Sequence, residues 1–413
     1  MIRIICFFVF ISLFGLGTSP IQAQNLLTLH EAIVRAIQHN PALEGSRSDV
    51  KMAALGVQQA RLNPNPQLSL SAKQPDFETS FLLEQTIDLW GKQSIEIRRA
   101  TRLHDIAILN YHEKQLEMAT KVSRAFLDTW ALQEQQEVMI SFLKMEETYF
   151  RQISEKVLAG TASEQDKKRA GVQVSLQRLL LQKTINQVKI KKRALSQLWG
   201  EIDPSFDLIS GDFYSLPTPL SLEKYRSRLP ENLTLKIAEK SIDLAQSSTD
   251  AVKSNPWSPV TFGAGLHYKQ DNGQTAGILS LFVPVPLSDQ NQWKIEQASQ
   301  GIKKALSEKQ TLSLAVLQEL EMSESQLQIA YREAHTLKTD MLPTLDSIRK
   351  NALEGYLQGK WPYIEVIEAH KANLNTELTY IEVVKQYHQA LAHICELTND
   401  FNDALKGEFH DIQ

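Results

Sequence analysis

Acidic side chains on one predicted helix are the residues of this sequence whose type and spacing could act on an ion. Glu365 and Glu368 lie three positions apart, which places both on one face of a helix. Asp166 follows Gly160 at the same distance at which Glu365 follows Gly359. Grouped carboxylates attract cations. A solvated acidic helix face gives the same pattern, however, and the residues alone favour that plainer interpretation.

The remaining polar residues give no indication of an enzyme. The sequence has no Gly-rich phosphate loop, no nucleophile elbow and no zinc-protease His pair. Its ten histidines are scattered: His388 and His393 fall on different helix faces, and His104 and His112 are aligned but lack a third ligand nearby in sequence. We therefore expect no catalytic residue, no cofactor and no metal ligand.

The first 23 of the 413 residues have the features of a secretory signal peptide. Arg3 supplies the positive start, and the apolar run of about 13 residues that follows is too short to span a bilayer as a helix. Ile21-Gln22-Ala23 offers a cleavage site. An uncleaved anchor is the alternative. The mature chain is expected to lie outside the cytoplasm.

The mature composition excludes several classes of protein. Loss of Arg3 changes the formal charge from −4 to −5, a mild acidity that gives no nucleic-acid-binding surface. Cys6 leaves with the signal, so Cys395 has no partner for an internal disulfide. No later apolar stretch approaches the roughly 18 residues of a membrane-spanning helix. A water-soluble protein or a β-barrel remains.

Glycine and proline are nearly absent from long stretches, which predicts very long helices. The stretches with at most one such residue are 92–159, 161–199, 287–342 and 363–406. The first would be about 100 Å long at 1.5 Å per residue. Its apolar residues recur at mostly three- and four-residue steps: Val122, Phe126, Trp130, Met139, Phe142, Met145, Tyr149, Ile153 and Val157. The length favours coiled bundles or tubes over an amphipathic helix on a globular core.

Four short segments break the helical pattern and alternate between apolar and polar residues, as strands do. They are 67–72, 81–89, 260–268 and 277–285. Short polar turns join them in pairs, at 73–78 and at 269–274, where Asn272-Gly273 lies. The sequence therefore predicts two β-hairpins, at 67–89 and 260–285.

The chain is internally duplicated. Asn63 matches Asn255, Ile87 matches Val285, and three later anchors, including Gly160 with Gly359, share an offset of 199 residues. Several ordered anchors at nearly one spacing indicate a repeated unit. We expect a first unit of helix, hairpin and long helical hairpin at 24–200 and a second at 231–406. A proline-containing linker, 201–230, separates them, and a short tail covers 407–413.

Two hairpins supply four strands, which are too few to close a sheet. In lipid every backbone polar group must be paired, so the sheet must close, and the smallest bacterial barrels have about eight strands. The sequence therefore predicts either a soluble sheet or one shared by several copies. Aromatic residues favour the membrane, because Trp90 and Trp257 flank one end of the hairpins and Phe77 and Tyr268 the other. Chance placement at strand ends is the alternative.

The sequence resembles TolC-type outer-membrane efflux proteins over essentially the whole mature chain. The segments that carry the resemblance are the strand-to-helix joints Gln85-Thr86-Ile87-Asp88-Leu89-Trp90-Gly91-Lys92 and Val283-Pro284-Val285-Pro286-Leu287 and the helix tips Val157-Leu158-Ala159-Gly160-Thr161 and Tyr356-Leu357-Gln358-Gly359-Lys360. The resemblance implies a mainly α-helical homotrimer. Its long helical hairpins would form an α-barrel across the periplasm, and four strands per chain would build a shared 12-stranded β-barrel in outer-membrane lipid.

The resemblance also implies partners and a pore. The helical tips, with Gly160, Thr161, Gly359 and Lys360, would contact a periplasmic adaptor that links the channel to an inner-membrane pump. Acidic side chains near the tips would form the periplasmic pore constriction: Glu365, Glu368 and Asp166. The family usually has Asp at the positions where this chain has Glu365 and Glu368. In the first repeat, Asp166 is equivalent to Glu365, but the position equivalent to Glu368 is Arg169.

The joint at 88–93 is similar to that of the cobalt–zinc–cadmium resistance branch of the family, with departures at Trp90 and Gln93. We therefore expect a passive exit duct for heavy-metal cations, fed by an RND-type pump. A drug, organic-compound or type I secretion channel is the alternative. A periplasmic coiled-coil adaptor or scaffold is an alternative of another class, although an adaptor would need a small β-domain with more strands.

Overall fold

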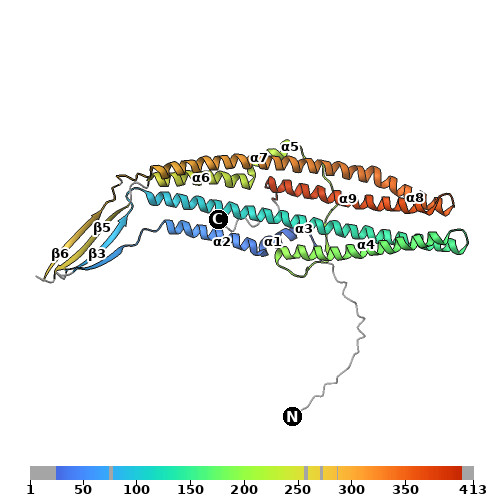
Figure 1. The fold of residues 1–413 in the computed structure, drawn as a ribbon, viewed down its shortest axis with the longest axis horizontal. Coiled ribbons are helices and arrows are strands. Elements are labelled where there is room, and N and C mark those ends of the chain that lie inside the picture. Colours follow the sequence, from blue (N-terminus) through green and yellow to red (C-terminus); the bar gives the residue numbers. More distant parts are fainter. Residues whose placement is uncertain (1–24, 74–77, 255–258, 270–272, 286, 402–413) are drawn as a thin grey trace, which may run out of the picture.

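The computed structural model describes residues 25–73, 78–254, 259–269, 273–285 and 287–401. These residues form an elongated molecule with a β-sheet at one end and two helical tips at the other (Figure 1). The predicted signal peptide, the tail at 407–413, Phe77 and Trp257 lie outside the described residues. Among the described helices, none combines the length and apolar character that crossing a membrane requires.

The four longer strands form one antiparallel sheet. The strands are β2 (Gln67–Lys73), β3 (Glu78–Ile87), β5 (Val260–Lys269) and β6 (Gln274–Phe282). Their order is β2-β3-β5-β6, so each strand pairs with its neighbour along the chain. The strands pair as two antiparallel hairpins require, and β3 and β6 each begin three residues earlier than predicted. Strand β6 ends before Pro284, which has no N–H to donate to a ladder.

Two helical hairpins make up most of the length. The first joins α3 (Lys92–Leu158), of 67 residues, to α4 (Glu164–Ser196), which ends in the 3₁₀ turn η1 (Gln197–Trp199). The second joins α7 (Gln292–Thr336), η3 (Leu337–Met341) and α8 (Leu342–Leu357) to α9 (Tyr363–Leu397). The long helices predicted from the absence of Gly and Pro are therefore present.

The second long helix contains a π-helical segment that the sequence analysis did not predict. This segment, η3, lies just before Pro343. Proline lacks the N–H that would bond four residues back, and its ring crowds the carbonyl there. A π turn absorbs such a mismatch without ending the helix. The hydroxyl of Thr344 donates to the Asp340 carbonyl at 2.7 Å, which satisfies one group beside the distortion.

Shorter elements precede each hairpin. In the first repeat they are α1 (Leu29–His39) and α2 (Pro41–Ala60), where a single helix was expected. Asn40 explains the break, because it ends α1 in an extended conformation and its side chain caps α2, with Pro41 in the first turn. In the second repeat the equivalent helix is α6 (Leu233–Ser254).

The segment between the repeats has structure of its own. Its strand β4 (Leu208–Ile209) pairs in parallel with β1 (Leu26–Leu27). It continues through α5 (Leu222–Arg226), which contacts α7, and η2 (Leu229–Glu231). This segment therefore crosses the helices at mid-length rather than linking two separate bodies.

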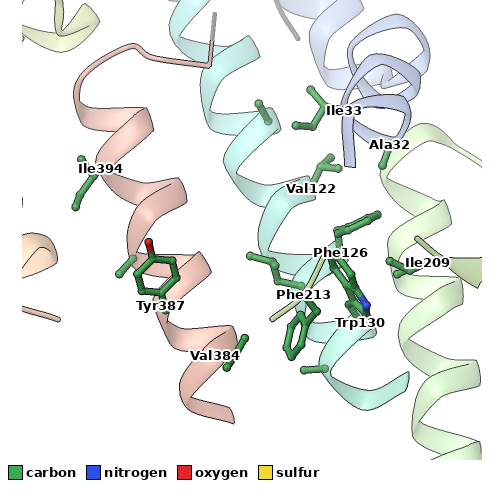
Figure 2. Close-up of a cluster of buried hydrophobic side chains, with 14 of the residues drawn as sticks. Ala32, Ile33, Val122, Phe126, Trp130, Ile209, Phe213, Val384, Tyr387 and Ile394 are labelled. Carbon is green, nitrogen blue, oxygen red and sulfur yellow. The ribbon is translucent and has the colours of Figure 1, made fainter. Parts of the chain in front are cut away.

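The main hydrophobic core lies at that mid-length crossing. Phe126 and Trp130 of α3 pack edge to face at 5.7 Å between ring centroids, and Phe213 packs 5.2 Å from Trp130. Figure 2 shows these rings near Ile209, and Tyr387 of the neighbouring helix α9 belongs to the same cluster. The predicted seam is largely buried: Val122, Phe126, Trp130, Met139, Phe142, Tyr149 and Ile153. Met145 and Val157 are half-buried against a second cluster nearer the tips.

Candidate functional site: the helical tips and the sheet

The first helical hairpin reverses at Gly160. This glycine has a φ of +72°, in the left-handed region that favours glycine. The N–H of Thr161 donates to the Lys156 carbonyl at 2.9 Å, and the N–H of Gly160 donates to the Val157 carbonyl at 3.0 Å. This pair of bonds is a Schellman motif, which satisfies the last carbonyls of α3.

The second tip has the same backbone hydrogen bonds as the first. Gly359 also has a φ of +72°. The N–H of Lys360 donates to the Gly355 carbonyl at 2.8 Å, and that of Gly359 to the Tyr356 carbonyl at 2.9 Å. Gly160, Thr161, Gly359 and Lys360 are all exposed. The four tip residues named from the sequence therefore form two exposed turns of the same geometry.

The returning helices are capped differently. The Ser163 hydroxyl accepts hydrogen bonds from the N–H groups of Gln165 at 3.0 Å and Asp166 at 3.3 Å, as an N-cap does. Pro362 precedes α9 and offers no side-chain bond. The caps fix where each returning helix begins, and hence where Asp166 and Glu365 lie in its first turn.

Polar contacts tie the second hairpin to the first near the tips. The Lys156 ammonium donates to the Leu357 carbonyl. The Tyr356 hydroxyl donates to the Asp166 carboxylate at 3.4 Å, and Arg349 donates to the Tyr149 hydroxyl at 2.6 Å. Burial, reinforced by the Asp166 carboxylate, raises the pKa of Tyr356 to about 12, so its hydroxyl remains a donor at neutral pH.

The acidic residues singled out from the sequence fall into two places. Glu365 and Glu368 are exposed and line a groove of about 530 Å³ between α8 and α9, beside Leu345, Ile348 and Trp361. Asp166 is half-buried, is not among the residues lining that groove, and instead accepts the Tyr356 bond. Within one chain, the structure brings together Glu365 and Glu368 but not Asp166.

One face of the sheet carries most of its large apolar side chains, and the other carries most of its polar ones together with Leu82, Ile278 and Phe282. Cross-strand register places large apolar side chains on the first: Leu68, Leu70, Phe81, Leu83, Phe262, Leu266, Leu279 and Leu281. All eight are largely exposed in the single chain, up to 89% for Leu279. An exposed apolar surface of this kind marks a contact with lipid or protein.

Polar side chains on the opposite face bond across the strands. The Ser69 hydroxyl donates to Glu84 at 3.3 Å. Hydroxyl pairs join Ser71 to Ser80 and Thr86 to Thr261, each at 3.1 Å. Lys269 and Glu78 lie 3.6 Å apart at the far end of the same face. This alternation of apolar and polar faces is that of a strand between lipid and a water-filled lumen.

Both outer edges of the sheet have one neighbour each. Strand β2 pairs with β3, and β6 pairs with β5, and no further pairing of β2 or β6 occurs in the described ranges. An edge strand presents unpaired N–H and C=O groups. The sheet is therefore open and can be extended on both sides.

Of the aromatic residues predicted to lie at the membrane interface, the two that the structure describes lie at opposite ends of the sheet. Trp90 follows the end of β3, where Ile87 pairs with Val260, and is 47% exposed. Tyr268 lies at the other end, paired with Thr79, and is 44% exposed. A further exposed aromatic residue, Trp293, lies in the first turn of α7 and is 79% exposed, and no strand pattern in the sequence pointed to it.

Two histidines of α9 have structural partners. His388 Nε2 lies 2.8 Å from the Phe213 carbonyl, and burial lowers its pKa. Both ring nitrogens of His393 face carboxylates, Glu319 at 2.9 Å and Glu396 at 3.0 Å. Across the part of the chain that the structure describes, no group of three or more His, Cys, Asp or Glu is placed to hold a metal ion.

A buried acid–base pair also escaped sequence analysis. Glu146 of α3 and His370 of α9 lie 3.2 Å apart and are almost wholly buried. They are 224 positions apart, and no local spacing signals their contact. The repeat offset is a weak signal at best, because it aligns Glu146 with position 345, not with His370.

Comparison with known proteins identifies the fold and the family. The family model described as "Outer membrane efflux protein" matches residues 32–201 and 225–400. The chain is 24% identical over 378 residues to the cobalt-zinc-cadmium resistance protein CzcC of Cupriavidus metallidurans, covering 91% of this chain and 90% of that protein.

Solved structures share the architecture at low sequence identity. The outer membrane protein VceC of Vibrio cholerae superposes with a TM-score of 0.73 at 16% identity, covering 90% of this chain and 95% of its own. CusC superposes with a TM-score of 0.75 at 14% identity, and the match covers 90% of this chain and 91% of the CusC chain. At such identities the likeness shows the fold alone.

Proposed function

This chain belongs to the outer membrane efflux protein family, and from that membership we propose that it forms the outer-membrane exit duct of a tripartite efflux system. Family and fold locate it in the outer membrane, extending into the periplasm. Three copies of the four-stranded sheet give a closed barrel of twelve strands. The observation that carries the proposal is the two-faced sheet with two unpaired edges, because lipid admits a sheet only when it is closed.

The helical hairpins continue the duct away from the membrane. The 67 residues of α3 span about 100 Å, and they run from the sheet to a tip (Figure 1). Two hairpins per chain give twelve helical segments round a trimer axis. The sequence has no nucleotide-binding motif, so we propose that the inner-membrane pump supplies the energy and that the duct is passive.

The tips are the proposed contact with a periplasmic adaptor. Gly160, Thr161, Gly359 and Lys360 form two equivalent exposed turns, which suits a partner that contacts both repeats alike. The neighbouring groove combines Leu345, Ile348 and Trp361 with two carboxylates. An amphipathic helix with basic side chains beside its apolar face fits that groove.

The acidic residues are proposed to line the periplasmic pore constriction. Glu365 and Glu368 from three chains would place six carboxylates round one axis, which favours cations. Asp166 is proposed to border the constriction on the first hairpin, where its carboxylate accepts the hydrogen bond from Tyr356.

Heavy-metal cations are the proposed cargo, with an RND-type pump as the driving partner. The support is the relative named for cobalt, zinc and cadmium resistance, together with the acidic groove. The test is a strain lacking its own exit duct that carries this chain with its adaptor and pump. Restored tolerance of cobalt, zinc and cadmium supports the cargo. Restored tolerance of dyes or detergents, without metals, assigns the duct to organic compounds.

A further inference from the structure

Glu146 and His370 form a buried contact between the two helical hairpins. Glu146 Oε1 lies 3.2 Å from His370 Nε2, and the side chains are only 7% and 3% exposed. The His370 ring packs edge-on against Phe142 at 4.8 Å and Tyr149 at 5.7 Å. Neither ring nitrogen has an aligned hydrogen-bond partner in the described part of the chain. The Glu146 carboxyl is therefore within reach of a nitrogen that nothing else satisfies.

We propose that Glu146 and His370 hold one shared proton, and that this proton keeps the contact between α3 and α9 insensitive to periplasmic pH. An ionised carboxylate or a bare imidazolium would be costly at this site. A carboxylic acid beside a neutral imidazole carries no net charge and can donate its proton to the ring nitrogen. The inference concerns the stability of the hairpin contact and goes beyond the proposed transport function.

The charges around the pair are consistent with one proton rather than two or none. Two charged groups act on the pair: Lys371 of α9 acts on Glu146, and Arg349 of α8 acts on His370. Glu146 in turn raises the pKa of Tyr149 on α3 and of Tyr363 on α9, whose hydroxyls carry no charge at neutral pH. Arg349 already bonds Tyr149 and Asp346, and its positive charge disfavours an imidazolium at His370. Lys371 favours the Glu146 anion, but burial outweighs it.

Burial shifts the pKa values of Glu146 and His370 in opposite directions. Burial raises the pKa of Glu146 from 4.5 to about 7 and lowers that of His370 from 6.5 to about 4. When the hairpins separate, water restores both ordinary values, and between pH 4.5 and 6.5 the separated pair carries one proton, on His370. The packed pair also carries one, on Glu146. Because neither state gains a proton, packing does not depend on pH in this interval.

Replacing either Glu146 or His370 alone should make the stability of the contact between α3 and α9 depend on pH, because the opposite effects of the two groups no longer offset each other. In Glu146→Gln only His370 titrates, and since its pKa is lowered by packing, the contact weakens as pH falls from 6.5 towards 4.5. In His370→Gln only Glu146 titrates, and since its pKa is raised, the contact weakens as pH rises from 4.5 towards 6.5. The expected changes are on the order of 10- to 100-fold, in opposite directions.

The experiment measures amide hydrogen exchange in the purified full-length mature protein across this pH interval, corrected for the intrinsic rates. Peptides from α3 and α9 around the pair report the contact, and peptides from α2 report the rest of the molecule. Glu147→Gln is the matched control, because Glu147 is the next residue, is 46% exposed and pairs with Arg178 at 2.7 Å. It should behave as the wild type, whose protection stays flat.

Two results would overturn the inference: wild-type protection that varies as steeply as that of either variant, or variants that shift in the same direction. If a variant fails to fold, infrared spectra of the wild type test the protonation state of Glu146 without any substitution. The wild type should show a protonated carboxylic acid band at pH 6.5 that disappears above the Glu146 value of about 7. Absence of that band below pH 6.5 contradicts the shared proton.

Discussion

The Tyr356 hydroxyl donates to the Asp166 carboxylate at 3.4 Å and so joins the tip of α8 to the first turn of α4. Replacing Tyr356 by Phe removes that bond while keeping the ring. A hydrogen bond to a partly exposed group contributes about 0.5–1.5 kcal/mol, so we expect the tips to separate roughly two- to tenfold more often per chain.

Opening frequency of single channels in planar bilayers measures this change. Tyr380→Phe is the control, because the Tyr380 hydroxyl is buried without a hydrogen-bond partner among the described residues. Equal opening by Tyr356→Phe and the wild type would show that the contact does not hold the tips together.

The acidic groove should act on cations. The double substitution Glu365→Gln, Glu368→Gln removes six carboxylates from a trimer, so block of the single-channel current by divalent cations should weaken severalfold. Glu321→Gln, at an exposed position of α7, should leave the block unchanged. Unaltered conductance and unaltered divalent sensitivity in the double variant would remove both residues from the constriction.

The tip glycines should be intolerant of a side chain. At a φ of +72° an alanine is strained, so Gly359→Ala is expected to destabilise the protein by about 1–2 kcal/mol. Gly301 lies inside α7 with open space where a Cβ would stand, and Gly301→Ala should stabilise by about 0.5–1 kcal/mol. Thermal unfolding midpoints should therefore move in opposite directions, and equal shifts would contradict the tip geometry.

The two faces of the sheet should respond differently to charge. Leu279→Arg puts a cation on the apolar face, where it costs about 2–4 kcal/mol at the membrane midplane. Ala276→Arg puts the same residue on the polar face, beside His267. We expect much less Leu279→Arg than Ala276→Arg protein in outer membranes by quantitative fractionation. More Leu279→Arg than Ala276→Arg protein in outer membranes would mean that the face carrying Leu279 does not contact lipid.

His393 should make the contact between α7 and α9 pH-dependent. Its ring nitrogens face Glu396 and Glu319, and the bond to Glu396 is the main cause that raises its pKa. The stabilisation is complete below the ordinary value of 6.5 and is lost as pH rises through the raised value. His393→Gln should therefore lower the unfolding midpoint in acid and have little effect in alkali. A variant that is equally destabilised at both extremes would contradict the charged state.

The sequence was informative where structure depends on local pattern. The strands β2 and β5 and the long helix α3 follow from alternation and from the absence of Gly and Pro, and each lies within a few residues of its predicted bounds. The tips follow from Gly160 and Gly359, since a left-handed turn requires such residues. These features need no knowledge of distant contacts.

The features that escaped prediction depend on packing between repeats. The contact of Glu146 with His370 and the bond of Arg349 to Tyr149 are set by how α3 lies against α8 and α9, which no local spacing encodes. The π segment before Pro343 was recoverable in principle, because the proline was visible at the end of a long helical stretch. Asp166 was grouped with Glu365 and Glu368 by repeat position, yet its carboxylate faces Tyr356.

The oligomeric state of the protein extracted from outer membranes tests the central claim most directly. Native mass spectrometry of the full mature chain in detergent should give a trimer, because four strands with two unpaired edges leave the lipid-facing sheet unsealed in a single copy. A monomer that remains in solution without detergent would contradict the account.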